Sequence, residues 1–224
     1  MHITMLRRGF KAVCKATEDR FQNFQIRVHR SLSWLERALE MDEKTQPEGR
    51  LLYAWISLSA LYGTWDVQAG FPGREGESRA AFIAMLTGID SSGLLADQLR
   101  ALEADILRLV DNKFLDPRYW KDPARPGNVH GTYQRAVRAY GEQKWGLILE
   151  LVLERIAVLR GQIVHGAATR GSRLNRQSLQ RCRKVLEALL PAVLQLVIEH
   201  RADDDWPPLC YPPIQEESGV PRAS

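Results

Sequence analysis

The chain has 224 residues, 45% of them hydrophobic, which is enough to bury one sizeable core. Its 31 lysines and arginines exceed its 27 acidic residues by only four, so the location of the excess charge matters more than its size. Three widely spaced cysteines and five scattered histidines exclude a disulfide framework and a zinc site of the usual spacing. We therefore expect a reducing compartment, no metal and no cofactor.

The N-terminal residues 1–17 are charged and lack the apolar run of a signal peptide, so they are interpreted as an N-terminal extension. The longest apolar stretches lie at 145–159 and 185–198 and are interrupted by charged residues and a proline. They fall short of the roughly 18–20 apolar residues that a membrane span needs. The sequence thus predicts a soluble, cytoplasmic protein that does not associate with a membrane.

Helical patterns begin at residue 18. Apolar residues from Phe21 to Leu39 recur every three or four positions, which predicts an amphipathic helix over 18–41. A second helix begins near Glu48, is apolar around most of its circumference, and ends before a surface loop rich in glycine and proline. A short helix follows at 77–87, and Asp90, Ser91 and Ser92 are candidate N-caps of a core helix that extends to about residue 112.

Residues 117–141 contain three prolines and are expected to form turns and a helical fragment. Long helices resume at Glu142, and the last runs from about Asn175 to His200 with a kink or a restart at Pro191. No segment shows the alternation of a strand between hairpin turns. The sequence predicts an all-α antiparallel bundle over 18–201, followed by an irregular, proline-rich C-terminal tail over 202–224 that covers the bundle or trails away from it.

The stretch LRGQIVHG at 159–166 ends the helix that starts near Glu142 and places three polar side chains, Arg160, Gln162 and His165, close together. In a regular helix, residues five apart point about 140° away from each other. Gly161 and Gly166 offer a way to loosen the last turn and to end the helix in the left-handed conformation. Spacing alone favours equally a helix end that satisfies its own polar groups and a site at which Arg160 and His165 act on an anion.

From Arg155 to Leu186 the chain has no acidic residue and eight positive charges. One interpretation is a solvated helix face with cations that favour a helix C-terminus. The other is a binding surface for a polyanion, because a local block of arginine neutralises several phosphates. On this second interpretation the candidate RNA-binding residues are four arginines: Arg155, Arg170, Arg173 and Arg176.

LRGQIVHGAATRGS resembles the signature of HEPN domains, in which an arginine, four to six intervening residues and a histidine mark the end of a core helix. RVHRSLSWLERALEMD and LLYAWISLSALYG are similar to the first two helices of large bacterial HEPN proteins, and WPPLCYPP is similar to their C-terminal segment. The resemblance implies a HEPN-like bundle at 18–201 and a metal-independent endoribonuclease that acts on RNA as a homodimer. Toxins and antiviral effectors are typical members, so an antitoxin or defence-system protein is a further partner to expect.

The resemblance implies that Arg160 and His165 are catalytic and that two copies supply the two imidazoles of one site. The chain departs from the family pattern at Gly161, where active members usually have asparagine, aspartate or histidine, so that Gln162 supplies the nearest supporting polar group. The alternative is a non-catalytic HEPN module that binds a nucleotide, RNA or a partner protein. Gly161 favours this module, whereas Arg160, His165 and the surrounding arginines favour the nuclease.

Overall fold

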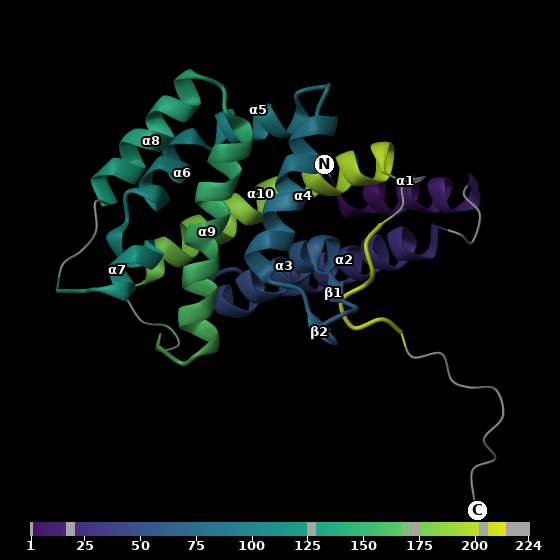
Figure 1. The fold of residues 1–224 in the computed structure, drawn as a ribbon, viewed down its shortest axis with the longest axis horizontal. Coiled ribbons are helices and arrows are strands. Elements are labelled where there is room, and N and C mark those ends of the chain that lie inside the picture. The colour runs from purple at the N-terminus through teal and green to yellow at the C-terminus, as the bar shows by residue number, and fades with distance from the viewer. Residues whose placement is uncertain are drawn as a thin grey trace, which may run out of the picture.

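The computed structural model describes residues 2–16, 21–124, 129–167, 169, 171, 175–201 and 206–213. The described part is all-α, which confirms the predicted fold class. Besides a single turn of 3-10 helix, it contains ten α-helices and a two-stranded hairpin (Figure 1). The elements, in chain order, are α1 (Ile3–Ala16), α2 (Gln22–Glu40), α3 (Pro47–Tyr62), β1 (Trp65–Asp66), β2 (Phe71–Pro72), α4 (Glu75–Ile89), α5 (Leu94–Ala101), α6 (Glu103–Val110), η2 (Lys113–Leu115), α7 (Pro117–Lys121), α8 (Val129–Gly141), α9 (Trp145–Val164) and α10 (Arg176–His200).

α10 is the central helix of the bundle and packs against α1, α3, α4, α5, α6 and α9. Its second half is buried almost all round, and it stays one continuous helix through Pro191, without the predicted restart. α2 and α3 pack along each other as a pair on one side of α10 (Figure 1). Among the described helices none is by itself long and apolar enough to cross a membrane, and the one pair that passes by length and composition, α4 with α5, is bent by 110°.

α1 corrects the predicted domain boundary at residue 17. This helix buries Leu6 and Phe10 in the same core cluster as the rest of the bundle, and Phe10 contacts the ring of Phe24 on α2 edge-on at 6.2 Å. A salt bridge from Arg7 to Glu36 also joins the two helices. The first helix is therefore an integral part of the bundle and not an extension to it. Only two of its side chains are buried, Leu6 and Phe10.

The region expected to be one core helix from 90 to 112 forms two helices, which are separated by a break at Leu102. The Asp90 carboxylate caps the first of them by accepting hydrogen bonds from the backbone N–H groups of Leu95 and Ala96, both at 3.1 Å. The predicted role of Asp90 at the helix start is thus confirmed, although Gly93 is the residue that precedes the first helical position.

Residues 206–213 of the tail lie over α2 and the C-terminal end of α3. The buried guanidinium of Arg27 on α2 holds them there: it donates to four carbonyl groups, those of Leu61, Gly63, Pro207 and Pro208. Because burial disfavours the charged form, the pKa of Arg27 is lowered to about 10. Leu209 forms a β-bridge with Thr64, and Trp206 is buried, so this part of the tail belongs to the core.

Candidate functional site

The helix that carries the RxxxxH motif, α9, ends at the protein surface. Gly166 takes the left-handed conformation, with φ of 70°, which confirms the predicted helix end. The backbone N–H of Ala167 donates to the carbonyl of Gln162 at 2.8 Å, and that of Gly166 donates to Ile163 at 3.1 Å, which together form a Schellman motif. Val164 and His165, the last residues before this turn, are exposed. His165 is therefore presented to solvent at a well-defined helix terminus.

Gly161 does not loosen the last turn of α9. The helix is regular to Val164, and the N–H of His165 donates to the carbonyl of Gly161 at 3.0 Å, as in an unbroken helix. Residues five apart therefore keep their separation of about 140° around the axis. Within one chain Arg160 and His165 do not converge, and a site that contains both needs a second surface.

Arg160 lies on the side of α9 that faces α3 and α4. Its Nη2 donates to both carboxylate oxygens of Glu75, at 2.6 and 2.8 Å, and its guanidinium carbon lies 5.4 Å from the centre of the Trp55 ring. These groups line an open cleft of about 590 Å³ between α3, the β-hairpin and the C-terminal segment. Glu75 was not predicted as a partner of Arg160, because it belongs to the glycine- and proline-rich stretch GFPGREGE at 70–77, which was expected to be a surface loop.

The carboxylate of Glu75 is shared by several groups in this cleft. The hydroxyl of Tyr62 donates to it at 3.1 Å, and Arg79 lies 3.7 Å away on the next turn of α4. Burial of Tyr62, together with the negative charge of Glu75, raises the pKa of Tyr62 to about 12. The phenol therefore stays protonated at neutral pH and acts as a hydrogen-bond donor. Arg160 is held by a pre-formed anionic partner.

Gln162 lies on another side of α9. Its amide donates to the backbone carbonyl of Phe114, at 3.0 Å, in the 3-10 turn η2. This amide thus connects the end of α9 to η2 and is not directed at Arg160. The expectation that Gln162 supports the catalytic pair directly finds no contact among the described residues.

Arg155 is a correction to the predicted RNA-binding set. Its side chain has no exposed surface, and its Nη2 donates to the equally buried carboxylate of Asp116 at 2.8 Å. Burial lowers the pKa of Arg155, and the charge of Asp116 opposes that shift. A guanidinium at this position cannot reach a ligand in solvent, so Arg155 does not belong to the RNA-binding residues. It stabilises the core by connecting α9 to the start of α7.

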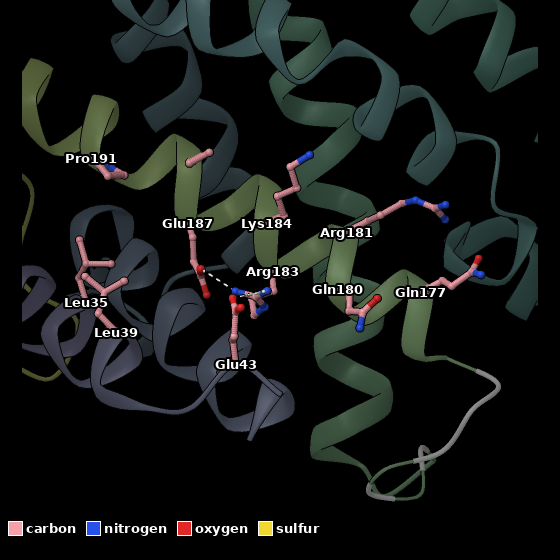
Figure 2. A pocket seen from close by; sticks show the side chains of 11 residues that line it. Leu35, Leu39, Glu43, Gln177, Gln180, Arg181, Arg183, Lys184, Glu187 and Pro191 are labelled. Atoms are coloured by element: carbon pink, nitrogen blue, oxygen red, sulfur yellow. Dashed lines mark hydrogen bonds and ion pairs between the residues drawn. The ribbon is translucent and has the colours of Figure 1, made fainter. Parts of the chain in front are cut away.

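Three of the cations of α10, Arg181, Arg183 and Lys184, are paired with carboxylates. Arg183 binds Glu187 one turn on and Glu43 after α2, at 2.9 and 3.0 Å, along an open groove beside α10 (Figure 2). Lys184 and Arg181 share Asp105 of α6, at 2.5 and 3.9 Å. Five of the eight cations in the positive block of the sequence are thus paired with carboxylates, most of which are distant along the chain.

The remaining cations of the predicted RNA-binding set follow α9 in the sequence. Arg176, the first residue of α10, is exposed. Arg170 and Arg173 lie outside the described residues.

In the described part of the chain, no three His, Cys, Asp or Glu residues are grouped as a metal site requires. Comparison with protein-family models, with curated proteins and with solved structures finds no match to this chain.

Proposed function

We propose that this protein is a metal-independent endoribonuclease of the HEPN type that is active as a homodimer. The observation that supports this most is the end of α9, where His165 is exposed at a capped helix terminus and Arg160 lies in an open cleft just over one turn earlier. Cleavage by attack of the RNA 2′-hydroxyl on the adjacent phosphate needs a base, an acid and positive charge on the phosphate oxygens. One chain supplies only one imidazole, so the reaction requires two.

In the proposed dimer the two α9 termini face each other across the two-fold axis. The neutral His165 of one copy removes the proton from the 2′-hydroxyl, whose oxygen attacks phosphorus. The protonated His165 of the second copy gives its proton to the departing 5′-oxygen. The products are a 2′,3′-cyclic phosphate and a 5′-hydroxyl end, and no metal takes part. The Arg160 guanidinium groups stabilise the charge that develops on the phosphate.

Exposed apolar residues support an interface at this end of the bundle. Val164 is 57% exposed immediately before His165, and Trp34, Ile56 and Tyr211 are exposed around the adjoining cleft. Apolar side chains grouped on a surface are typical of contact sites between proteins. A two-fold interface would cover the same residues on both copies.

The nuclease proposal is tested by incubating the purified protein with mixed RNA in excess chelator. The parent should cleave, whereas His165→Gln, which keeps hydrogen bonding but cannot carry a proton near neutral pH, should not. Arg160→Lys should lower the rate sharply, because a lysine lacks the planar fork that grips two phosphate oxygens. Gly161→Asn should raise activity because it restores the polar residue usual in active members of the family, and a Cβ at residue 161 meets no atom within 4 Å. Failure of both the parent and Gly161→Asn to cleave RNA would contradict the proposal.

The alternative is a non-catalytic HEPN module, and one observation favours it. Two polar side chains of the motif already have partners within the chain, since Arg160 is bound by Glu75 and Gln162 by the carbonyl of Phe114. Such a module would bind RNA, a nucleotide or a partner protein without cutting. Tight RNA binding without cleavage, unchanged in His165→Gln, would select this alternative.

A further inference from the structure

Two large aromatic side chains are exposed beside the last turn of α9. Phe114 of η2 is 47% exposed and Trp120 of α7 is 52% exposed. Tyr119 lies between them and contacts each ring edge-on, with centroids 5.3 Å from Phe114 and 5.2 Å from Trp120. Aromatic side chains of this size usually bury most of their surface, so two exposed rings joined by a partly buried third mark a candidate binding surface.

Backbone contacts fix these rings in place. The indole N–H of Trp120 donates to the carbonyl of Phe114 at 2.9 Å, and the amide of Gln162 donates to the same oxygen at 3.0 Å. Leu115 and Asp116, directly after Phe114, are fully buried and anchor the turn. Because the polar atom of the indole is satisfied internally, Phe114 and Trp120 offer ring faces and not hydrogen-bond donors. It lies against the helix turn that precedes His165.

Lys113 places a positive charge against the cluster, whereas the guanidinium of Arg118 is paired with Asp116 at 2.7 Å. The ammonium of Lys113 lies 5.0 Å from the centre of the Phe114 ring and 5.9 Å from that of Tyr119. Exposed rings next to cations match unpaired nucleic acid, whose bases stack on aromatic faces and whose phosphates attract ammonium groups. The exposed charged residues of segment 111–124 are three cations and two carboxylates: Lys113, Arg118, Lys121, Asp111 and Asp122.

We propose that Phe114 and Trp120 form a stacking platform for unpaired bases of single-stranded RNA, next to the end of α9. The identity of the ligand as RNA rests on the proposed function, but binding to the platform can be measured without cleavage. Because every base has a π-face, the platform distinguishes single strands from duplexes and shows little preference among bases. Its position would guide the strand toward His165.

The platform is tested with a short, fluorescein-labelled 2′-O-methyl oligouridine, which lacks the free 2′-hydroxyl that the proposed cleavage requires. Fluorescence anisotropy should show binding to the parent, and Trp120→Ala and Phe114→Ala should each weaken it by about tenfold. Trp120→Phe keeps a stacking ring but loses the hydrogen bond to Phe114, and it should bind much as the parent does. Phe71→Ala removes an equally exposed ring from the β-hairpin, and it should leave the affinity unchanged.

Several results would overturn the platform. One is unchanged oligouridine affinity in Trp120→Ala, and another is equal affinity of the parent for a duplex. A third is the loss of the dimer by light scattering in Trp120→Ala while RNA affinity is retained, which would make the cluster a subunit interface. Oligouridine binding that depends on Trp120 in a protein that never cleaves unmodified RNA would overturn the nuclease and leave the platform standing. Cleavage of unmodified RNA with an unchanged KM in Trp120→Ala would overturn the platform and leave the nuclease proposal intact.

Discussion

Replacing Asp116 with asparagine removes one charge from the core and takes away the buried carboxylate partner of Arg155, whose other carboxylate partner is the partly exposed Glu154, at 3.2 Å. Neither the Asp116 nor the Arg155 side chain has exposed surface. Asparagine keeps the oxygen that caps α7 through the N–H of Arg118, so the change is mainly one of charge. It replaces the oxygen that accepts hydrogen bonds from both Arg118 and Arg155, at 2.7 and 2.8 Å, with an amide that can only donate.

The expected loss of stability follows from the burial of this pair. Removing one partner of a buried ion pair typically costs about 3–5 kcal/mol. For a chain of this length that corresponds to a fall in Tm of roughly 6–20 °C. The loss should be measured by urea unfolding followed by circular dichroism. Asp97→Asn is the matched control, because its ion pair with Arg100 is exposed and should contribute about 1 kcal/mol or less.

The effect of Asp116→Asn should also depend on pH. Burial alone would raise the pKa of Asp116, but hydrogen bonds from Arg118 and the charge of Arg155 lower it below its ordinary value. A carboxylate with a lowered pKa stabilises the fold above its unfolded pKa of about 3.9, and this stabilisation disappears as the pH falls through the folded pKa. The difference between parent and variant should therefore shrink in acid. A variant within about 1 kcal/mol of the parent at pH 7 would refute this account of the core.

Three further outcomes follow from the described contacts. Glu75→Gln should free Arg160 for phosphate, so RNA should bind more tightly and the slope of log K against log salt should steepen by about 0.7; unchanged salt dependence would contradict this. Gly166→Ala should destabilise the fold by about 1–2 kcal/mol because φ is positive there, whereas Gly161→Ala in the helix should stabilise it by about 0.5–1 kcal/mol, as urea unfolding would show. Cys182 is buried, which raises its pKa, so maleimide should spare it in the folded protein, and rapid labelling detected by mass spectrometry would count against its burial.

Apolar periodicity predicted the long helices well because each buries one face. The intervals for α2, α3, α9 and α10 differ from those observed by a few residues at most at their ends. α1 was missed because it buries only two side chains, Leu6 and Phe10. The break at Leu102 was missed because the buried residues of α5 and α6 keep the spacing of one helix, so the apolar pattern continues across the break.

The candidate site was harder to predict because its partners are distant in the chain. Arg155 follows Val152 and precedes Ile156 and Leu159 on the buried face of α9, and this spacing could have shown that it lies inside. Its partner Asp116, and Glu75 as the partner of Arg160, leave no comparable pattern. A count of charges along the chain therefore overestimated the free positive surface. The Schellman end at Gly166 was predictable because it depends on local backbone geometry alone.

The central claim is that His165 takes part in metal-free cleavage of RNA through its 2′-hydroxyl. The most direct measurement is mass spectrometry of the fragment ends that the parent and His165→Gln produce from unmodified RNA in excess chelator. The parent should produce fragments with 2′,3′-cyclic phosphate and 5′-hydroxyl ends, and His165→Gln should produce no fragments. Fragments with 3′-hydroxyl ends, the same fragments from His165→Gln, or no fragments at all would contradict it.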